Sequence, residues 1–181
     1  MQVKAIISAA IEVKEEEGYE VKADIMIPLV GTDKELEIIR EKSEKVAKGL
    51  LEDTTTDIHY TIGTMIEIPR AALLADRIAK HADFFSFGTN DLTQMTYGFS
   101  RDDAGKFISQ YLEQEIFAKD PFQVLDQDGV GKLIENTVKL GREEKPELKI
   151  GICGEHGGEP ASIEFCHKNN LNYVSCSPYR V

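Results

Sequence analysis

The sequence is poor in proline, cysteine and positive charge, and each shortage excludes a class of protein. Only six prolines occur among 181 residues, and 41% of the residues are hydrophobic. That composition is typical of a globular chain and not of a disordered or fibrous one. The three cysteines, Cys153, Cys166 and Cys176, are odd in number, and their spacings fit no zinc-binding template. We therefore expect no disulfide framework and a reducing compartment.

The shortage of positive charge bears on binding partners. Lysine and arginine number 21 against 32 aspartates and glutamates, which gives a formal net charge of −11. Nucleic acid requires a basic face, and an anionic membrane repels so acidic a surface. We expect neither as a partner. An anionic substrate would have to be held by local cations, a metal ion or backbone N–H groups.

Long apolar segments are also absent from the sequence. No run of 18 apolar residues is present, as a membrane-spanning helix would require. The N-terminus has neither the uninterrupted apolar core nor the small-residue cleavage site of a signal peptide. These features favour a cytoplasmic location.

A regular alternation of helix and strand patterns runs along the whole chain. Short apolar runs predict buried strands at 24–30, 58–67, 83–88, 148–153 and 171–176. Helical spacing of apolar residues predicts helices at 3–18, 36–50, 69–81, 130–141 and 160–167. Residues 32–35 fit a capping box for the second of these helices. Loops and short helices are expected over 92–125.

This alternation predicts an α/β fold with a parallel sheet. The strands are apolar throughout, so we expect helices to cover both faces of the sheet. Two arrangements of the sheet fit this pattern: an open doubly wound sheet, or part of a (β/α)8 barrel. A complete barrel needs about 250 residues and rarely fewer than about 200. A chain of 181 residues is too short for one.

Three side chains that could bind a metal or take part in catalysis stand at the carboxyl ends of the predicted strands. Glu67 ends the second strand, Asp91 follows the third in the segment Gly88-Thr89-Asn90-Asp91, and Cys153 ends the fourth. Ligands of parallel α/β folds bind at the carboxyl ends of the strands. We therefore expect Glu67, Asp91 and Cys153 to meet at one edge of the sheet.

Each carboxylate has a metal-binding and a structural interpretation. Glu67 stands between isoleucines, where a carboxylate is unfavourable unless it is paired or bound to metal. It could instead cap the helix at Pro69 or pair with Arg70. Asp91 is an oxygen donor suited to Mg²⁺, although it could also cap the helix that begins at Leu92. Their common position favours the metal site.

The remaining candidates surround the predicted metal site. The turn Gly88-Thr89-Asn90 can present successive N–H groups to an anion. Cys153 could act as a nucleophile or a proton donor, or could be a buried small hydrophobe, the interpretation adopted for Cys166 and Cys176. For His156, both a place beside the thiol and an ordinary loop position fit the sequence. No glycine-rich nucleotide-binding motif is present.

Four segments together resemble a known family. GTMIEIPRAALLADRIA, FFSFGTNDLTQMTYGFSRDDAGKF, GICGEHGG and NYVSCSPYRV are similar to the C-terminal domain of PEP-utilising enzymes (PEP, phosphoenolpyruvate), and in particular of pyruvate phosphate dikinases. The resemblance implies about five βα units from the C-terminal part of a TIM (β/α)8 barrel that binds phosphoenolpyruvate and pyruvate. It also implies that residues 1–181 form a single partial domain, with nucleotide-binding and phosphohistidine domains elsewhere in the full-length enzyme.

The same resemblance implies roles for the candidate residues. Glu67 and Asp91 would bind Mg²⁺, and Glu67 with Gly88-Thr89-Asn90-Asp91 would contact the substrate. Cys153 would exchange a proton with the substrate's methyl or methylene carbon. The implied reaction is phosphoryl transfer between a phosphohistidine and pyruvate enolate.

The resemblance further implies a homodimer and an overall interconversion of ATP, phosphate and pyruvate with AMP, diphosphate and phosphoenolpyruvate. The chain alone would be inactive. The alternatives are a phosphoenolpyruvate synthase or Enzyme I-type relative, and an inactive binding or dimerisation module. The role of Arg101 stays open.

Overall fold

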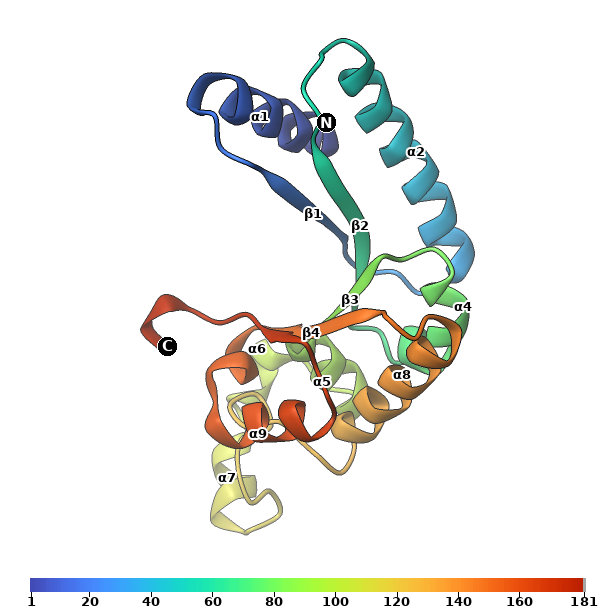
Figure 1. The fold of residues 1–181 in the computed structure, drawn as a ribbon. Coiled ribbons are helices and arrows are strands. Elements are labelled where there is room, and N and C mark those ends of the chain that lie inside the picture. Colours follow the sequence, from blue (N-terminus) through green and yellow to red (C-terminus); the bar gives the residue numbers. More distant parts are fainter. Residues whose placement is uncertain (181) are drawn as a thin grey trace.

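The computed structural model describes residues 1–180, which form one parallel five-stranded sheet with flanking helices (Figure 1). The strands are β1 (Lys22–Ile27), β2 (His59–Ile66), β3 (Phe84–Gly88), β4 (Lys149–Cys153) and β5 (Tyr173–Val174), and they lie side by side in chain order. A doubly wound sheet would reverse its strand order at a switch point. The sequential order is that of a barrel segment, so the predicted partial-barrel α/β fold is confirmed.

The helices alternate with the strands along the chain. They are α1 (Gln2–Glu17), α2 (Asp33–Glu52), α3 (Pro69–Leu73), α4 (Ala75–Ala79), α5 (Thr89–Tyr97), α6 (Arg101–Ala104), α7 (Ile108–Glu113), α8 (Val130–Glu144) and α9 (Pro160–Lys168), with 3₁₀ turns η1 (Glu155–Gly158) and η2 (Pro178–Arg180). None of the helices within residues 1–180 is long and apolar enough to cross a bilayer.

Local sequence signals explain most helix ends. The Thr32 hydroxyl accepts the Glu35 N–H and the Glu35 carboxylate accepts the Thr32 N–H, so the predicted capping box opens α2. Three expected boundaries were wrong. The first strand ends at Ile27, because Pro28 cannot donate a ladder hydrogen bond. The helix expected over 69–81 is interrupted at Leu74, and the last strand contains only two residues.

The two faces of the sheet have different chemistry. Strand register places Ile66, Phe87 and Ile152 on one face, all fully buried in the main core. That core also contains residues of α2, α3, α4, α8 and α9. Ser86 and Tyr173 share the opposite face, because side chains alternate along a strand. The expectation of an apolar sheet covered on both faces was therefore wrong, since polar groups stand beside Met65 and Phe84 on the second face.

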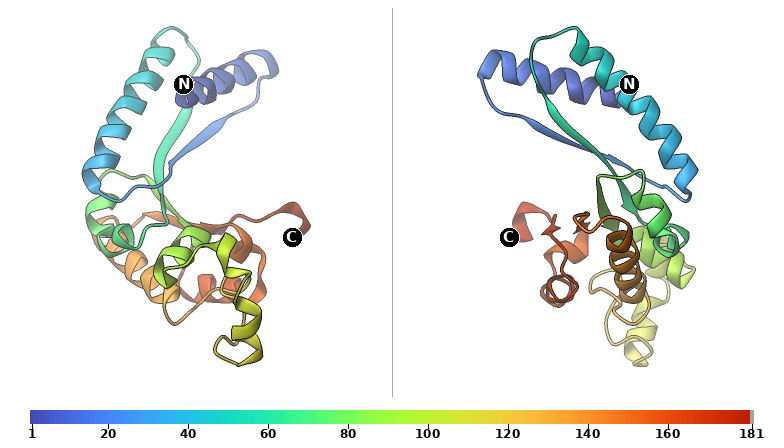
Figure 2. Two further views of the ribbon diagram at one scale, coloured as in Figure 1. Left: turned by 180° about the vertical axis from the view of Figure 1, so that it is seen from behind. Right: turned by 45° about the vertical axis from the view of Figure 1, so that its right-hand side comes forward.

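The ends of the molecule are unlike each other (Figures 1 and 2). Helices α1 and α2 pack together on β1 and β2 around a small second core. At the opposite end, the predicted irregular segment projects beyond the sheet and contains α6 and α7. Its stability comes from a cluster of aromatic rings, whose centroids lie 5.1–6.5 Å apart.

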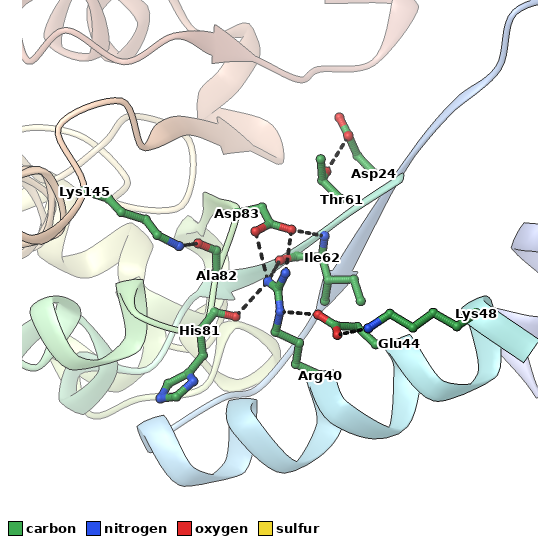
Figure 3. Close-up of polar contacts among 10 residues, drawn as sticks. All are labelled: Asp24, Arg40, Glu44, Lys48, Thr61, Ile62, His81, Ala82, Asp83 and Lys145. Atoms are coloured by element: carbon green, nitrogen blue, oxygen red, sulfur yellow. Dashed lines mark hydrogen bonds and ion pairs between the residues drawn. The ribbon is translucent and has the colours of Figure 1, made fainter. Parts of the chain in front are cut away.

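Arg40 on α2 joins three segments near the amino-terminal end of β3 (Figure 3). Its guanidinium donates to the carbonyl oxygens of Ile62 and His81 at 3.0 and 3.1 Å, and to the Asp83 carboxylate at 3.1 Å. Asp83 in turn accepts the Ile62 N–H at 2.8 Å. Arg40 therefore connects α2 to the β2–β3 pair, on the side of the sheet away from the carboxyl ends of the strands.

Arg40→Ala is expected to lower the free energy of unfolding by about 2 kcal/mol, because it leaves two carbonyls and a half-buried carboxylate with fewer partners. Urea unfolding of the chain measures this difference. Lys48→Ala is the control, because the exposed Lys48 pairs with Glu44 and exposed pairs contribute little. Equal stability of the two variants would contradict the structural role of Arg40.

Candidate active site

Glu67 lies at the carboxyl end of β2 and is only 4% exposed. Its Oε1 accepts the backbone N–H of Leu29 at 2.6 Å. Leu29 adopts φ 57°, which a leucine rarely does, so the loop after β1 directs an amide towards the carboxylate. The carboxylate also lies against the Cα of Gly88, where an added Cβ would be 2.7 Å from Oε2. Only glycine allows this close approach.

Asp91 lies beside Glu67, in the first turn of α5. Burial raises the pKa of Glu67, and the nearby Asp91 charge raises it further, while the Leu29 hydrogen bond acts in the opposite direction. The Gln94 amide donates to Asp91 Oδ1 at 2.9 Å, and Gln94 Oε1 accepts the Arg101 N–H. The site therefore brings together two like charges, and Gln94 orients one of them.

The structural alternatives for the two carboxylates do not hold. No side chain caps α3, so Glu67 is not its cap, and the Arg70 guanidinium donates to the Gly31 carbonyl. Helix α5 begins at Thr89 with Gly88 as its N-cap, so Asp91 is not a cap either.

The residues present fit a divalent cation of the Mg²⁺ type. Within residues 1–180 no group of three or more histidine, cysteine, aspartate or glutamate side chains could hold a metal. Mg²⁺, however, is usually held by one or two carboxylates, with waters and substrate oxygens completing its shell. Asn90 Oδ1 is also buried there without a hydrogen-bond partner. Glu67 and Asp91 therefore suit a cation that shares its ligands with a substrate.

Cys153 ends β4 directly opposite Gly88 in the register, so it is close to the carboxylate pair. The half-buried thiol donates to the Phe87 carbonyl at 3.4 Å. Burial raises the pKa of Cys153; a hydrogen bond with Ser86 lowers it, and the Glu67 charge raises it. A thiol with a raised pKa keeps its proton at neutral pH, which suits a proton donor better than a nucleophile. Cys166, by contrast, is buried in α9, and burial raises its pKa to about 11.

Ser86 and Tyr173 are two neighbours of Cys153 that the sequence analysis missed. The Ser86 side chain is within hydrogen-bonding reach of both the thiol and the Tyr173 hydroxyl. Tyr173 donates to the Phe85 carbonyl at 3.1 Å. Alternation along the strands could have found both, because Ser86 lies two residues before Gly88 and therefore on the same face.

The turn after Cys153 is made by Gly154, whose φ of 93° and ψ of −160° belong to a region that is essentially restricted to glycine. The chain thereby leaves the sheet immediately after the thiol. A cleft of about 220 Å³ opens here, and Asn90, Gly154, Glu155, Ser175, Cys176, Ser177 and Arg180 line it. Arg101, whose role was left open, instead lines a neighbouring cleft with Arg180.

Thr89 and His156 are both fully buried behind this edge. His156 Nδ1 is 2.6 Å from the Thr89 hydroxyl, and Nε2 is 2.9 Å from the Pro121 carbonyl. His156 is therefore not an ordinary loop histidine, and its two ring nitrogens bond to Thr89 and Pro121 and not to the thiol. Because the Thr89 hydroxyl is engaged by the ring, Thr89 could contact a ligand only through its backbone.

Fold and site together define an α/β domain of the partial-barrel class, with paired carboxylates and a protonated thiol at the carboxyl edge of its sheet. The family described as "PEP-utilising enzyme, PEP-binding domain" matches residues 1–181. The chain belongs to this family, as the motifs predicted.

Three relatives are similar to this chain over its whole length. The chain is 61% identical over 181 residues to pyruvate, phosphate dikinase of Clostridium symbiosum, covering all of this chain and 21% of that protein. It is 54% identical to pyruvate, phosphate dikinase of Rhizobium meliloti, covering 20% of it, and 56% identical over 185 residues to pyruvate, phosphate dikinase 2 of Oryza sativa, again covering 20%. The chain thus spans about a fifth of the length of these relatives.

Among solved structures, the citrate synthase SbnG is similar, with a TM-score of 0.53 over 98% of this chain and 72% of that one. The sequence identity is 14%, so this likeness supports the fold alone.

Proposed function

We propose that the chain is the phosphoenolpyruvate/pyruvate-binding domain of a longer pyruvate phosphate dikinase. The observation that carries the proposal is the grouping of Glu67, Asp91 and Cys153 at one sheet edge, in a family member whose relatives are named dikinases. The domain would host phosphoryl transfer between pyruvate enolate and a phosphohistidine on another domain. With those other domains, ATP, phosphate and pyruvate would be interconverted with AMP, diphosphate and phosphoenolpyruvate.

The carboxylate pair has one role in this proposal. Glu67 and Asp91 would hold Mg²⁺, which would neutralise negative charge on the enolate and phosphoryl oxygens when bound. The raised pKa of Glu67 supports this assignment, because two like charges in a buried place need a cation to be favourable.

The first turn of α5 and the cleft beside it would bind the anionic substrate. Within residues 1–180 no side chain caps α5, so its first amides are available to an anion. The Asn90 NH2 group would donate to the carboxylate or carbonyl group of pyruvate, while its buried oxygen, which has no hydrogen-bond partner within residues 1–180, would stay available to the cation. Gly88 leaves room for the Glu67 carboxylate beside them.

Cys153 would donate a proton to the substrate in one direction and accept it in the other. As phosphoenolpyruvate loses its phosphoryl group, carbon 3 of the enolate takes the proton of the Cys153 thiol and leaves a thiolate. In the reverse direction the thiolate removes a proton from the methyl group of pyruvate. The Ser86 hydroxyl would stabilise the thiolate, in keeping with its lowering of the Cys153 pKa.

A chimera tests the proposal directly. This chain would replace the matched residues of the Clostridium symbiosum dikinase, and formation of phosphoenolpyruvate from ATP, phosphate and pyruvate would be measured. We expect an active chimera that needs a divalent cation, and no activity from the 181-residue chain alone. A folded but inactive chimera would favour the alternative of a binding or dimerisation module. Its size in solution would test the homodimer, which stays a prediction, as does a cytoplasmic location.

A further inference from the structure

One fully buried polar link is made by two side chains to which the proposed chemistry assigns no role. His156 in η1, Thr89 at the start of α5 and Pro121 after α7 meet through the imidazole ring of His156. These residues come from three separate segments of the chain. Histidine and threonine are each 0% exposed, so neither ring nitrogen has water as an alternative partner.

The contacts determine the protonation of the ring. A carbonyl oxygen can only accept, so Nε2, 2.9 Å from the Pro121 oxygen, must carry a proton. Burial lowers the pKa of His156, against opposing effects of the Pro121 hydrogen bond and the Glu159 charge. In a neutral ring with the proton on Nε2, Nδ1 accepts, and the Thr89 hydroxyl donates to it at 2.6 Å. Every polar atom of the ring is then satisfied.

This arrangement fixes Thr89, the residue with which α5 begins. Thr89 is the first residue of α5, and Asn90 and Asp91 follow it directly. The Thr89 hydroxyl is also 3.5 Å from the Cys153 carbonyl, so the same side chain lies against the end of β4. Movement of Thr89 would therefore displace both the carboxylate of Asp91 and the backbone next to the thiol.

We propose that His156 is a positioning residue: through Thr89 it holds Asn90 and Asp91 in place, and through Pro121 it couples them to the projecting segment that contains α6 and α7. His156 touches no substrate or metal in this role. The inference rests on the proposed function only for its metal readout, because the hydrogen-bonded link exists whatever the reaction.

Variants of the two partners test the link in the 181-residue chain. Thr89→Val removes the hydroxyl at constant shape, and Thr89→Ser keeps it. His156→Gln keeps a donor for Pro121 but has no acceptor at the position of Nδ1, which Thr89 needs. Ile134→Val is the control, because it removes a buried methyl group from α8, a helix that takes no part in the hydrogen bonds of His156 and Thr89. The readouts are amide hydrogen exchange of 89–92, Mn²⁺ affinity, and the ¹⁵N NMR signature of the histidine ring.

We expect a neutral ring protonated on Nε2 in the wild type. Thr89→Val and His156→Gln should each speed exchange at 89–92 and weaken Mn²⁺ binding by about tenfold, as for other residues that orient metal ligands. The double variant should be no weaker than either single one, because both remove the same link. Thr89→Ser and Ile134→Val should bind Mn²⁺ like the wild type.

Unchanged exchange in Thr89→Val, fully additive effects, or equal loss of affinity in Ile134→Val would overturn the proposal. If His156→Gln does not fold, the comparison of Thr89→Val with Thr89→Ser still decides it. If the wild-type chain binds no Mn²⁺, the proposed metal site is wrong. Amide hydrogen exchange of 89–92 and the ¹⁵N NMR signature still test the His156 link in that case.

Discussion

Replacing Cys153 by alanine in the chimeric dikinase should slow exchange of solvent deuterium into the methyl group of pyruvate by about 10²–10⁴-fold, the usual contribution of a positioned acid or base. The reason is that the half-buried thiol keeps its proton at neutral pH and faces the carboxylate pair. Cys153→Ser should be nearly as slow, because a hydroxyl releases its proton far less readily. Proton NMR of pyruvate in D₂O follows the exchange.

Cys166→Ala is the matched control for this experiment. Cys166 is another cysteine of low exposure, yet it packs in α9 within the main core. Its replacement should lower stability but leave the deuterium exchange rate unchanged. An unchanged rate in Cys153→Ala would exclude the thiol as the proton carrier, while Mn²⁺ binding in the same variant would show that the carboxylate pair is intact.

Much of the fold could be predicted because strand ends and helix caps are local signals. Gly18, with φ 72°, ends α1, and the capping box at Thr32 opens α2. The same local signals indicated that Glu67, Asp91 and Cys153 follow neighbouring strands. Parallel pairing in chain order then brings them to one edge.

Other features depend on packing, which local signals do not contain. Whether a face of the sheet is covered depends on neighbours, and an apolar strand such as β3 gave no warning that Ser86 faces polar groups. The His156 link joins segments that are distant in sequence, and its partner Pro121 stands directly before Phe122 of the aromatic cluster. Neither spacing nor composition indicates such a contact.

Glu67→Gln should raise the free energy of unfolding of the metal-free chain at neutral pH by about 1 kcal/mol. This is the usual gain in stability from a single stabilising substitution. The pKa of Glu67 is raised in the folded state. Its protonated form therefore favours folding below the ordinary glutamate pKa, and this contribution is lost as the pH rises through the raised pKa. Above it, the charged Glu67 opposes folding because it lies beside Asp91. Glutamine removes this charge but keeps an oxygen for the Leu29 N–H.

The gain in stability should therefore be present at pH 7 to 8 and disappear below about pH 4.5, near the ordinary glutamate pKa. Mn²⁺ at 100 times its dissociation constant should add about 2.7 kcal/mol to the wild type and nothing to Glu67→Gln. Urea unfolding with and without Mn²⁺ at several pH values measures both effects. Glu41→Gln, at an exposed α2 position, is the control. A Glu67→Gln chain that is less stable at pH 7, or still stabilised by Mn²⁺, would contradict the carboxylate pair as a metal site, because the charge that opposes folding is the same charge that would bind the cation.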